Sequence, residues 1–124
     1  MRALVQMLGA DTAVASCIGG AQKIISPAPT YPFLLALRAQ SKPLLVITSS
    51  SRGAEDLASE LRELHQNVLE FPAWETLPHE RLSPRSDTVA QRIQTLYALQ
   101  NKHSINPIVV TPVRGAIHRI ISNL

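Results

Sequence analysis

PLLVITSSSRGAEDLASELREL, residues 43–64, is the stretch of sequence that decides the fold class. It opens with a continuous apolar, β-rich run between Pro43 and a serine cluster, which is typical of a strand buried on both faces of a parallel sheet. An amphipathic helix follows, with Ser51 as its candidate N-cap. The apolar face of this helix consists of Ala54, Leu57, Ala58, Leu61 and Leu64. A buried strand followed at once by such a helix indicates a βαβ arrangement.

The same alternation of apolar runs and amphipathic segments continues on both sides of this stretch. Strands are expected at 22–26, 43–50, 67–71 and 106–111. Helices are expected near the N-terminus and at 31–40, 51–67, 86–99 and 112–124. Strand–helix units in this order wind right-handed into a parallel sheet covered by helices. The sequence therefore predicts an α/β fold with a mainly parallel, four-stranded sheet and flanking helices.

Two of these helices carry more specific predictions. Helix 86–99 begins with Ser86 or Asp87 as its cap. Its expected core-facing residues are Val89, Ile93, Leu96 and Tyr97. The last helix has Thr111 as its expected N-cap and Pro112 at its first position, where a missing N–H costs nothing.

Length and composition indicate one ordinary globular domain. The chain has 124 residues, of which 45% are hydrophobic and 17% charged, so wholesale disorder is not expected. A net charge of +3 from scattered basic residues permits a phosphate-facing patch without requiring one. The single cysteine, Cys17, excludes a disulfide within the chain and fits a reducing, cytoplasmic setting. No apolar run approaches the length of a membrane span, so no membrane partner is expected.

Residues 1–21 are interpreted as an N-terminal helix and linker, and residues 22–124 as the α/β lobe. The N-terminal segment superficially resembles a secretion signal that ends at Cys17. Gln6 and Asp11 interrupt its apolar run, however, and favour an ordinary leading helix.

The first strand-to-helix junction is where a phosphate-binding loop belongs in a fold of this class. Such a loop needs glycines for close backbone approach and a lysine to neutralise phosphate. This chain has ISPAPTYPFLL instead, with three prolines, no glycine and no lysine. Only Thr30 resembles the hydroxyl position, so Ser26, Pro27 and Thr30 mark a degenerate P-loop, and no bound cofactor is expected.

Other catalytic patterns are absent from the sequence. The four histidines have no metal-ligand spacing, and we expect neither a metal site nor a catalytic residue. One polar feature remains in VVTPVRG, where Thr111 and Arg114 stand at a strand end and a helix start. They could contact a DNA phosphate, although a well-capped helix with an exposed arginine explains the same residues.

Three segments, 43–64, 68–99 and 108–120, together closely resemble the N-terminal part of bacterial transcription-repair coupling factors. The most specific part is FPAWETLPHERLSP, followed by an arginine-bearing helix. The residues of this family-signature loop are Phe71, Pro72, Trp74, Glu75, Thr76, Leu77, Pro78 and Arg81. We interpret the loop first as a rigid structural connection, and second as a surface for neighbouring domains or DNA.

The resemblance implies a partial RecA-like lobe of the P-loop type, similar to the first helicase-like domain of the excision-repair B subunit. Coupling factors are ATP-driven DNA translocases that recognise RNA polymerase stalled at a lesion and recruit the excision-repair A subunit. Their motor, with its ATP and magnesium, lies further along the family's chain. The resemblance therefore implies a non-catalytic lobe, truncated before the inserted domain that docks the A subunit.

The implied partners are other domains of the same factor and, through the full-length protein, the A subunit and RNA polymerase. Two alternatives from other classes stay open. One is a nucleotide-dependent enzyme domain that acts through the strand-end loops. The other is a DNA-binding module, because TPVR, residues 111–114, resembles a helicase motif that contacts the backbone of duplex DNA.

Overall fold

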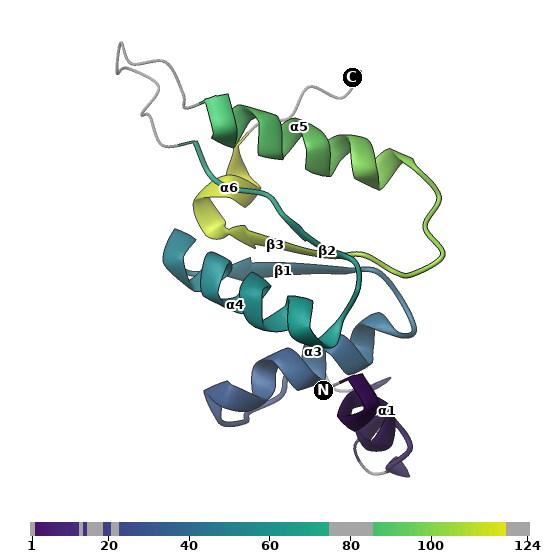
Figure 1. Cartoon of the computed structure of the whole chain (residues 1–124). Helices are drawn as coiled ribbons and strands as arrows, with labels where there is room; N and C mark the ends of the chain where they lie inside the picture. The colour runs from purple at the N-terminus through teal and green to yellow at the C-terminus, as the bar shows by residue number, and fades with distance from the viewer. Residues whose placement is uncertain (1, 13, 15–18, 21–22, 75–85, 119–124) are drawn as a thin grey trace.

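A parallel sheet of three strands runs through the centre of the part of the chain that the structure describes (Figure 1). This computed structural model describes residues 2–12, 14, 19–20, 23–74 and 86–118. The strands are β1 (Leu44–Thr48), β2 (Val68–Glu70) and β3 (Ile108–Pro112), in the spatial order β1-β3-β2. The last strand in sequence is thus the central one, and β1 and β2 flank it.

The register of the sheet follows from its two ladders. Leu44 pairs with Ile108 on one side of β3, and Val68 pairs with Ile108 on the other. All five residues of β3 are buried, as a continuous apolar run predicts for a central strand. The α/β class, the parallel sheet and the flanking helices are therefore confirmed.

The prediction of a four-stranded sheet is wrong for the described residues, which form three strands. The first expected strand, at 22–26, lies partly outside them, and from Lys23 onward its backbone is not in a strand. Ile24 and Ile25 are 40% and 86% exposed. β-branched residues favour a strand only when a neighbouring strand supports them, and among the described residues no strand pairs with this segment.

The helices and one short 3-10 turn account for most of the remaining described chain. They are α1 (Arg2–Gly9), η1 (Ala28–Thr30), α3 (Tyr31–Ala39), α4 (Ser51–Leu64), α5 (Ser86–Gln100) and α6 (Val113–Ile117). The helices expected at the N-terminus, at 31–40, at 51–67 and at 86–99 are confirmed within a few residues of their predicted ends. Among these helices, none is long and apolar enough to cross a bilayer.

The cap of α4 lies one residue earlier than predicted. Ser50, not Ser51, is the N-cap, and its Oγ accepts a hydrogen bond from the Gly53 N–H at 3.0 Å. Ser50 has the extended backbone that an N-cap requires, whereas Ser51 is already helical. A run of three serines offers the sequence no means of choosing between them.

The main core lies between α4 and one face of the sheet. It consists of Ala39, Ala54, Ala58, Leu61, Ile108 and Val110. The predicted stripe of α4 is confirmed, because four of its five residues are buried and Leu57 packs at the margin. A second cluster joins Val5 of α1 to Ala36, Leu37 and Leu64. The N-terminal helix therefore packs on α3 and α4, and a domain boundary at residue 21 stays a prediction.

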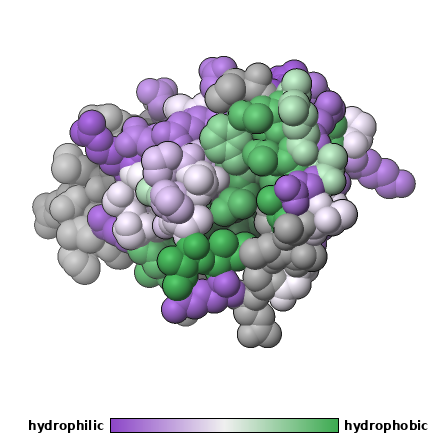
Figure 2. Space-filling view, turned by 90° about the horizontal axis from the view of Figure 1, so that it is seen from below, coloured by the Kyte–Doolittle hydropathy of each residue, from purple (hydrophilic) through white to green (hydrophobic). Residues whose placement is uncertain are grey.

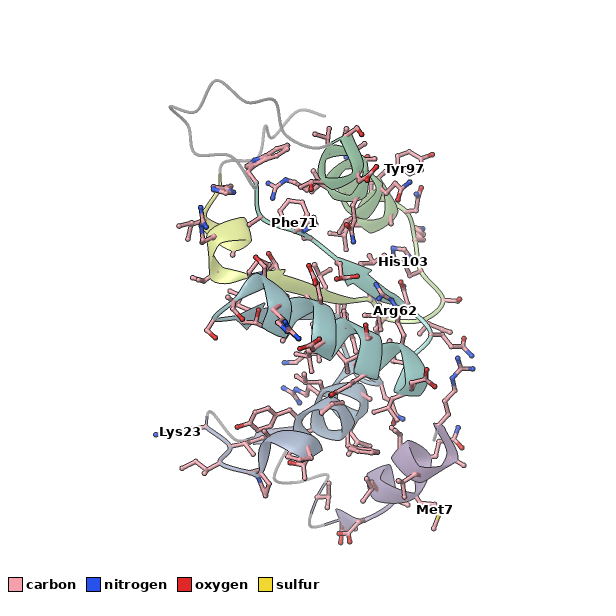
Figure 3. All side chains as sticks on the ribbon, turned by 60° about the vertical axis from the view of Figure 1, so that its left-hand side comes forward. Met7, Lys23, Arg62, Phe71, Tyr97 and His103 are labelled. Carbon is pink, nitrogen blue, oxygen red and sulfur yellow. The ribbon has the colours of Figure 1, made fainter. Side chains whose placement is uncertain are left out.

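Helix α5 covers the opposite side of the sheet from α4 (Figure 1). Its predicted orientation is wrong: the buried residues are Thr88, Arg92 and Thr95. Ile93 and Tyr97, expected in the core, are 58% and 68% exposed. Figure 3 shows Tyr97 on the outer side of this helix. The helix is thus turned by about one residue, or ~100°, from the orientation that its apolar pattern indicates.

Helix α6 begins after Pro112, which is its N-cap in place of the predicted Thr111. Pro112 is extended, with φ −69° and ψ 155°, and it remains paired with Thr48 in the sheet. Burial of the whole strand extends β3 past the threonine, so the helix starts one residue later than the capping pattern suggests. Residues 119–124 of the expected helix lie outside the described part of the chain.

Candidate functional site at the carboxyl edge of the sheet

The carboxyl ends of the three parallel strands define the edge where ligands bind in this class of fold. Glu70 ends β2 and is held at both its carbonyl and its carboxylate. Thr95 Oγ1 of α5 donates to the Glu70 carbonyl at 2.6 Å, and Arg62 of α4 forms an ion pair with the Glu70 carboxylate at 2.6 Å. These contacts attach the end of β2 to the helices on both sides of the sheet. Figure 3 labels Arg62 on α4.

Arg92 lies at the centre of this edge, although the sequence analysis did not select it. The residue is only 4% exposed, and its Nη1 donates to the Pro72 carbonyl at 2.6 Å. Its guanidinium stacks over the rings of Phe71 at 3.9 Å and Trp74 at 4.5 Å. Burial lowers the pKa of Arg92 below its ordinary value. Stacking and the carbonyl contact offset the free-energy cost of burying the Arg92 cation, because aromatic faces and carbonyl oxygens both attract positive charge.

The described part of the signature loop therefore has a structural role. Phe71 and Trp74 form the two aromatic surfaces for Arg92, and Pro72 supplies the carbonyl acceptor. The remaining loop residues of the prediction lie outside the described residues. They are Glu75, Thr76, Leu77, Pro78 and Arg81. A useful sequence signal existed in Thr88, Arg92 and Thr95, which form a polar stripe at helical spacing next to the apolar one.

Gly115 of α6 closes this edge from the other side. A Cβ at this position would lie 2.6 Å from Thr111 Oγ1 and 3.1 Å from the Phe71 carbonyl oxygen. Contacts below 3.0 Å are too short for a real Cβ. Glycine is therefore required so that α6 can pack against the chain leaving β2. The ends of β2 and β3 are brought together in this way.

Thr111 and Arg114, the predicted phosphate contacts, lie in different environments. Thr111 is 1% exposed, and its hydroxyl donates to the Pro112 carbonyl at 3.2 Å. Arg114 is exposed on α6. Nearby, His118 has a buried Nδ1 without a hydrogen-bond partner. Burial, and then the positive charges of Arg92 and Arg114, lower the pKa of His118. Contact of Thr111 or Arg114 with DNA stays a prediction.

The degenerate P-loop residues lie before α3. Thr30 Oγ1 donates to the Pro27 carbonyl at 2.6 Å, so this hydroxyl is engaged by its own turn. Ser26 Oγ is buried and has no hydrogen-bond partner. Ser26 lines a groove with Thr48 and Ser49, at the carboxyl end of β1. Across the described ranges, no hydrogen bond or ion pair joins these residues to Thr111 or Arg114.

Within the described ranges of the chain, no group of three or more His, Cys, Asp or Glu residues is placed to hold a metal ion. The absence of a metal site stays a prediction. The protein is thus a parallel α/β lobe, and at the carboxyl ends of its strands the guanidinium of Arg92 stacks on the chain that follows β2.

Comparison with known proteins shows which protein family this chain is similar to. No protein-family model matches the chain. It is 39% identical over 107 residues to the transcription-repair-coupling factors of Mycobacterium bovis and Mycobacterium tuberculosis, a match that covers 82% of the chain and 9% of each relative. The Haemophilus influenzae factor is 41% identical over 77 residues, covering 61% of the chain and 6% of that relative. The resemblance to bacterial transcription-repair coupling factors is therefore confirmed. The chain spans about a tenth of the length of these relatives.

Proposed function

We propose that this chain is a non-catalytic N-terminal lobe of a cytoplasmic transcription-repair coupling factor, which links stalled RNA polymerase to nucleotide excision repair. The observation that carries the proposal is the 39% identity over 82% of the chain. The proposal makes the chain a partial RecA-like lobe with a degenerate P-loop. Its partners are then the other domains of the factor and, through the full-length protein, the excision-repair A subunit and the polymerase.

The junction before α3 supports a lobe without nucleotide chemistry. Pro27, Pro29 and Pro32 have no N–H to donate to a phosphate, and the Thr30 hydroxyl donates to the Pro27 carbonyl. A phosphate cradle depends on several converging backbone N–H groups and a lysine. ATP and magnesium of the intact factor are bound, in this proposal, by the motor elsewhere in the protein.

A titration with Mg-ATP tests the non-catalytic role. The chain is expected to give no saturable heat or fluorescence change at micromolar nucleotide. Saturable micromolar binding that Thr30→Ala abolishes would instead support the alternative, a nucleotide-dependent domain acting through the first strand-to-helix loop. Thr88→Ala on α5 provides a threonine control remote from the loop.

One observation favours a second function, contact with the backbone of duplex DNA. Arg114 is exposed on α6, beside a second arginine and a histidine at the carboxyl edge. DNA binding by this edge should weaken steeply with salt, because phosphate contacts release counterions. In a mobility-shift series, Arg114→Ala should weaken binding whereas Arg2→Ala on α1 should not. Equal effects of both variants would remove Arg114 from this role.

A further inference from the structure

A pocket of about 320 Å³ lies at the amino ends of the strands, at the edge of the sheet opposite to the candidate site. Its walls come from α1, from the C-terminal ends of α3 and α4, and from residues 104–106, which lead into β3. Figure 2 looks onto the face that carries α1 and α3, and it shows apolar side chains beside hydrophilic ones there. The volume is at the lower end of the range of about 300–1,000 Å³ that is typical of ligand sites.

The floor of this amino-edge pocket is apolar. It consists of Val5, Ala36, Ala39 and Leu64, all of which are buried. Two of these four residues are alanines, whose short side chains leave space between α1 and the ends of α3 and α4. An apolar floor favours an apolar group, because contact between the two removes apolar surface from water. The floor therefore selects an apolar part of the occupant.

The rim of the pocket is polar and uncharged. It consists of Gln6, Gln40, Gln66 and Ser104, all of which are exposed. Within the described ranges, no hydrogen bond engages the side chains of these four residues. A glutamine amide both donates and accepts hydrogen bonds, and so does a serine hydroxyl. The rim can therefore pair with N–H and C=O groups of one occupant at the same time.

The charges around the pocket offset one another. Arg2 is the only Lys, Arg, Asp or Glu among the described residues that line it. This arginine lines the same pocket as the C-terminal ends of α3 and α4, where the helix dipoles place partial negative charge that a cation offsets. The pocket therefore favours neither an anion nor a cation, and its occupant is neutral.

Hydrogen bonds of the loop before β3 hold the walls of the pocket in place. Asn106 Nδ2 donates to the Ala39 carbonyl at the end of α3 at 3.0 Å. The Nε2 of His65, at the end of α4, donates to the Asn106 carbonyl at 2.7 Å. Asn67 Nδ2 donates to the Ile105 carbonyl at 3.0 Å. A pocket that is formed in advance loses less conformational freedom when an occupant binds.

We propose that this pocket binds a turn of a peptide, which inserts one apolar side chain onto the floor while its main-chain N–H and C=O groups pair with the rim. A turn exposes main-chain groups that need partners, whereas the main-chain groups of a helix are already paired with one another. A nucleobase has no aromatic face to stack on, because no Phe, Tyr or Trp is among the described residues that line the pocket.

This inference rests on the proposed function for the source of the peptide. The matched region covers only 9% of the mycobacterial relatives, so most segments of such a factor lie outside it. The turn is therefore assigned to another segment of the coupling factor. A weak contact is sufficient for such a segment, because a linked segment has an effective concentration in the millimolar range.

The probe is an array of overlapping 15-residue peptides that covers the coupling factor of Mycobacterium tuberculosis. The peptides are tested against the whole 124-residue chain at up to about 1 mM, and one region is expected to bind. Its binding should shift the side-chain amide NMR signals of Gln6, Gln40 and Gln66, but not that of Gln94, which is exposed on α5. Aspartate in place of the inserted apolar residue should weaken binding about tenfold or more, because a charge on an apolar floor is costly.

Two pairs of variants test the pocket from the side of the chain, and each changes an exposed residue so that the fold is kept. Ser104→Trp fills the mouth of the pocket and should weaken peptide binding about tenfold or more. Ser59→Trp on α4, away from the pocket, is its matched control. Gln66→Ala removes one hydrogen-bonding group of the rim and should weaken binding about three- to tenfold, whereas Gln94→Ala should not.

Several results would overturn the inference. These are the absence of any binding peptide, equal effects within either pair of variants, or NMR shifts confined to residues outside the pocket. Equal binding of the peptide and its aspartate variant would remove the role of the floor, and equal binding of a scrambled peptide would remove the coupling factor as its source. Failure of the proposed function is distinguishable: saturable ATP binding at Thr30 would refute the non-catalytic role whether or not a peptide binds in the pocket.

Discussion

Helices α4 and α5 cover opposite faces of the same sheet, yet they attach to it by opposite chemistry. α4 presents Ala54, Ala58 and Leu61 to the strands, and its buried contacts there are apolar, with the Arg62–Glu70 ion pair at their margin. α5 presents Arg92 and Thr95, which donate to carbonyls at the end of β2 and just beyond it. Burial of apolar area is non-directional, whereas a donor must meet a particular acceptor. The α4 side of the sheet therefore forms the hydrophobic core, whereas the α5 side fixes the position of the end of β2 and the chain just after it.

The largest effect expected from this comparison is in the α4 core. Leu61 is fully buried, so Leu61→Ala should lower the free energy of unfolding by about 2–5 kcal/mol. The matched change on α5, Ile93→Ala, should alter it by less than about 0.5 kcal/mol, because Ile93 is largely exposed. Urea unfolding followed by circular dichroism measures both. Equal losses would mean that α5 packs by its apolar face after all.

The next effect concerns the polar attachment of α5. Arg92→Ala leaves the Pro72 carbonyl without its donor and removes the cation from two aromatic faces, so a loss of about 1–3 kcal/mol is expected. Arg92→Lys should recover only part of it, since an ammonium lacks the planar stacking surface. Urea unfolding gives the stability, and Trp74 emission reports on the stack. An unchanged emission spectrum in Arg92→Ala would contradict the stacked arrangement.

The comparison also shows how far sequence reasoning reaches. The segment 43–64 predicted the strand β1 and the helix α4, because apolar burial determines both elements. Its prediction of a strand buried on both faces is wrong: Leu45 and Ile47 are 65% and 54% exposed, so one face of β1 is open. The orientation of α5 was wrong because Ile93 and Tyr97 form an apolar stripe of their own, and burial alone favours that stripe. The preference for Thr88, Arg92 and Thr95 depends on carbonyls that become available only after the chain leaving β2 is in place. The polar stripe of α5 is visible in the sequence, but no local pattern shows that acceptors will face it.

The strand expected at 22–26 was wrong for a similar reason. Its residues favour a β conformation, but a strand forms only with a partner, and the edge of β1 is not paired with it. The candidate site was predictable in outline, since the carboxyl edge follows from the parallel class. Its central residue, Arg92, was not, because its interactions with Phe71 and Trp74 join segments far apart in the sequence.

A third test concerns the closure of the carboxyl edge by α6. Gly115→Ala places a methyl group against Thr111 Oγ1 and the Phe71 carbonyl, and should cost about 1–3 kcal/mol of stability. Combining it with Thr111→Ala should recover part of the loss, because the nearest clashing atom is removed. A double-mutant cycle measures this coupling. Strict additivity of the two changes would show that the close approach is absent.

The smallest effect is a pH dependence at His118. Burial and the nearby arginines lower its pKa in the folded chain, while the unfolded chain protonates it near the ordinary value of about 6.5. The unfolded state therefore binds more protons below that pH, so stability should fall as pH drops from about 7 toward 5. His118→Gln should flatten this slope. Parallel slopes in the parent chain and the variant would contradict the assignment.

The most direct test of the central claim is an exchange of this lobe into a working coupling factor. The aligned 107-residue segment of the Mycobacterium tuberculosis factor is replaced by the matching part of this chain. Strand-specific repair is then measured in cells that lack their own factor. The account predicts that the transcribed strand regains its faster repair. A chimera that is folded and hydrolyses ATP but leaves both strands repaired at the same rate would contradict it.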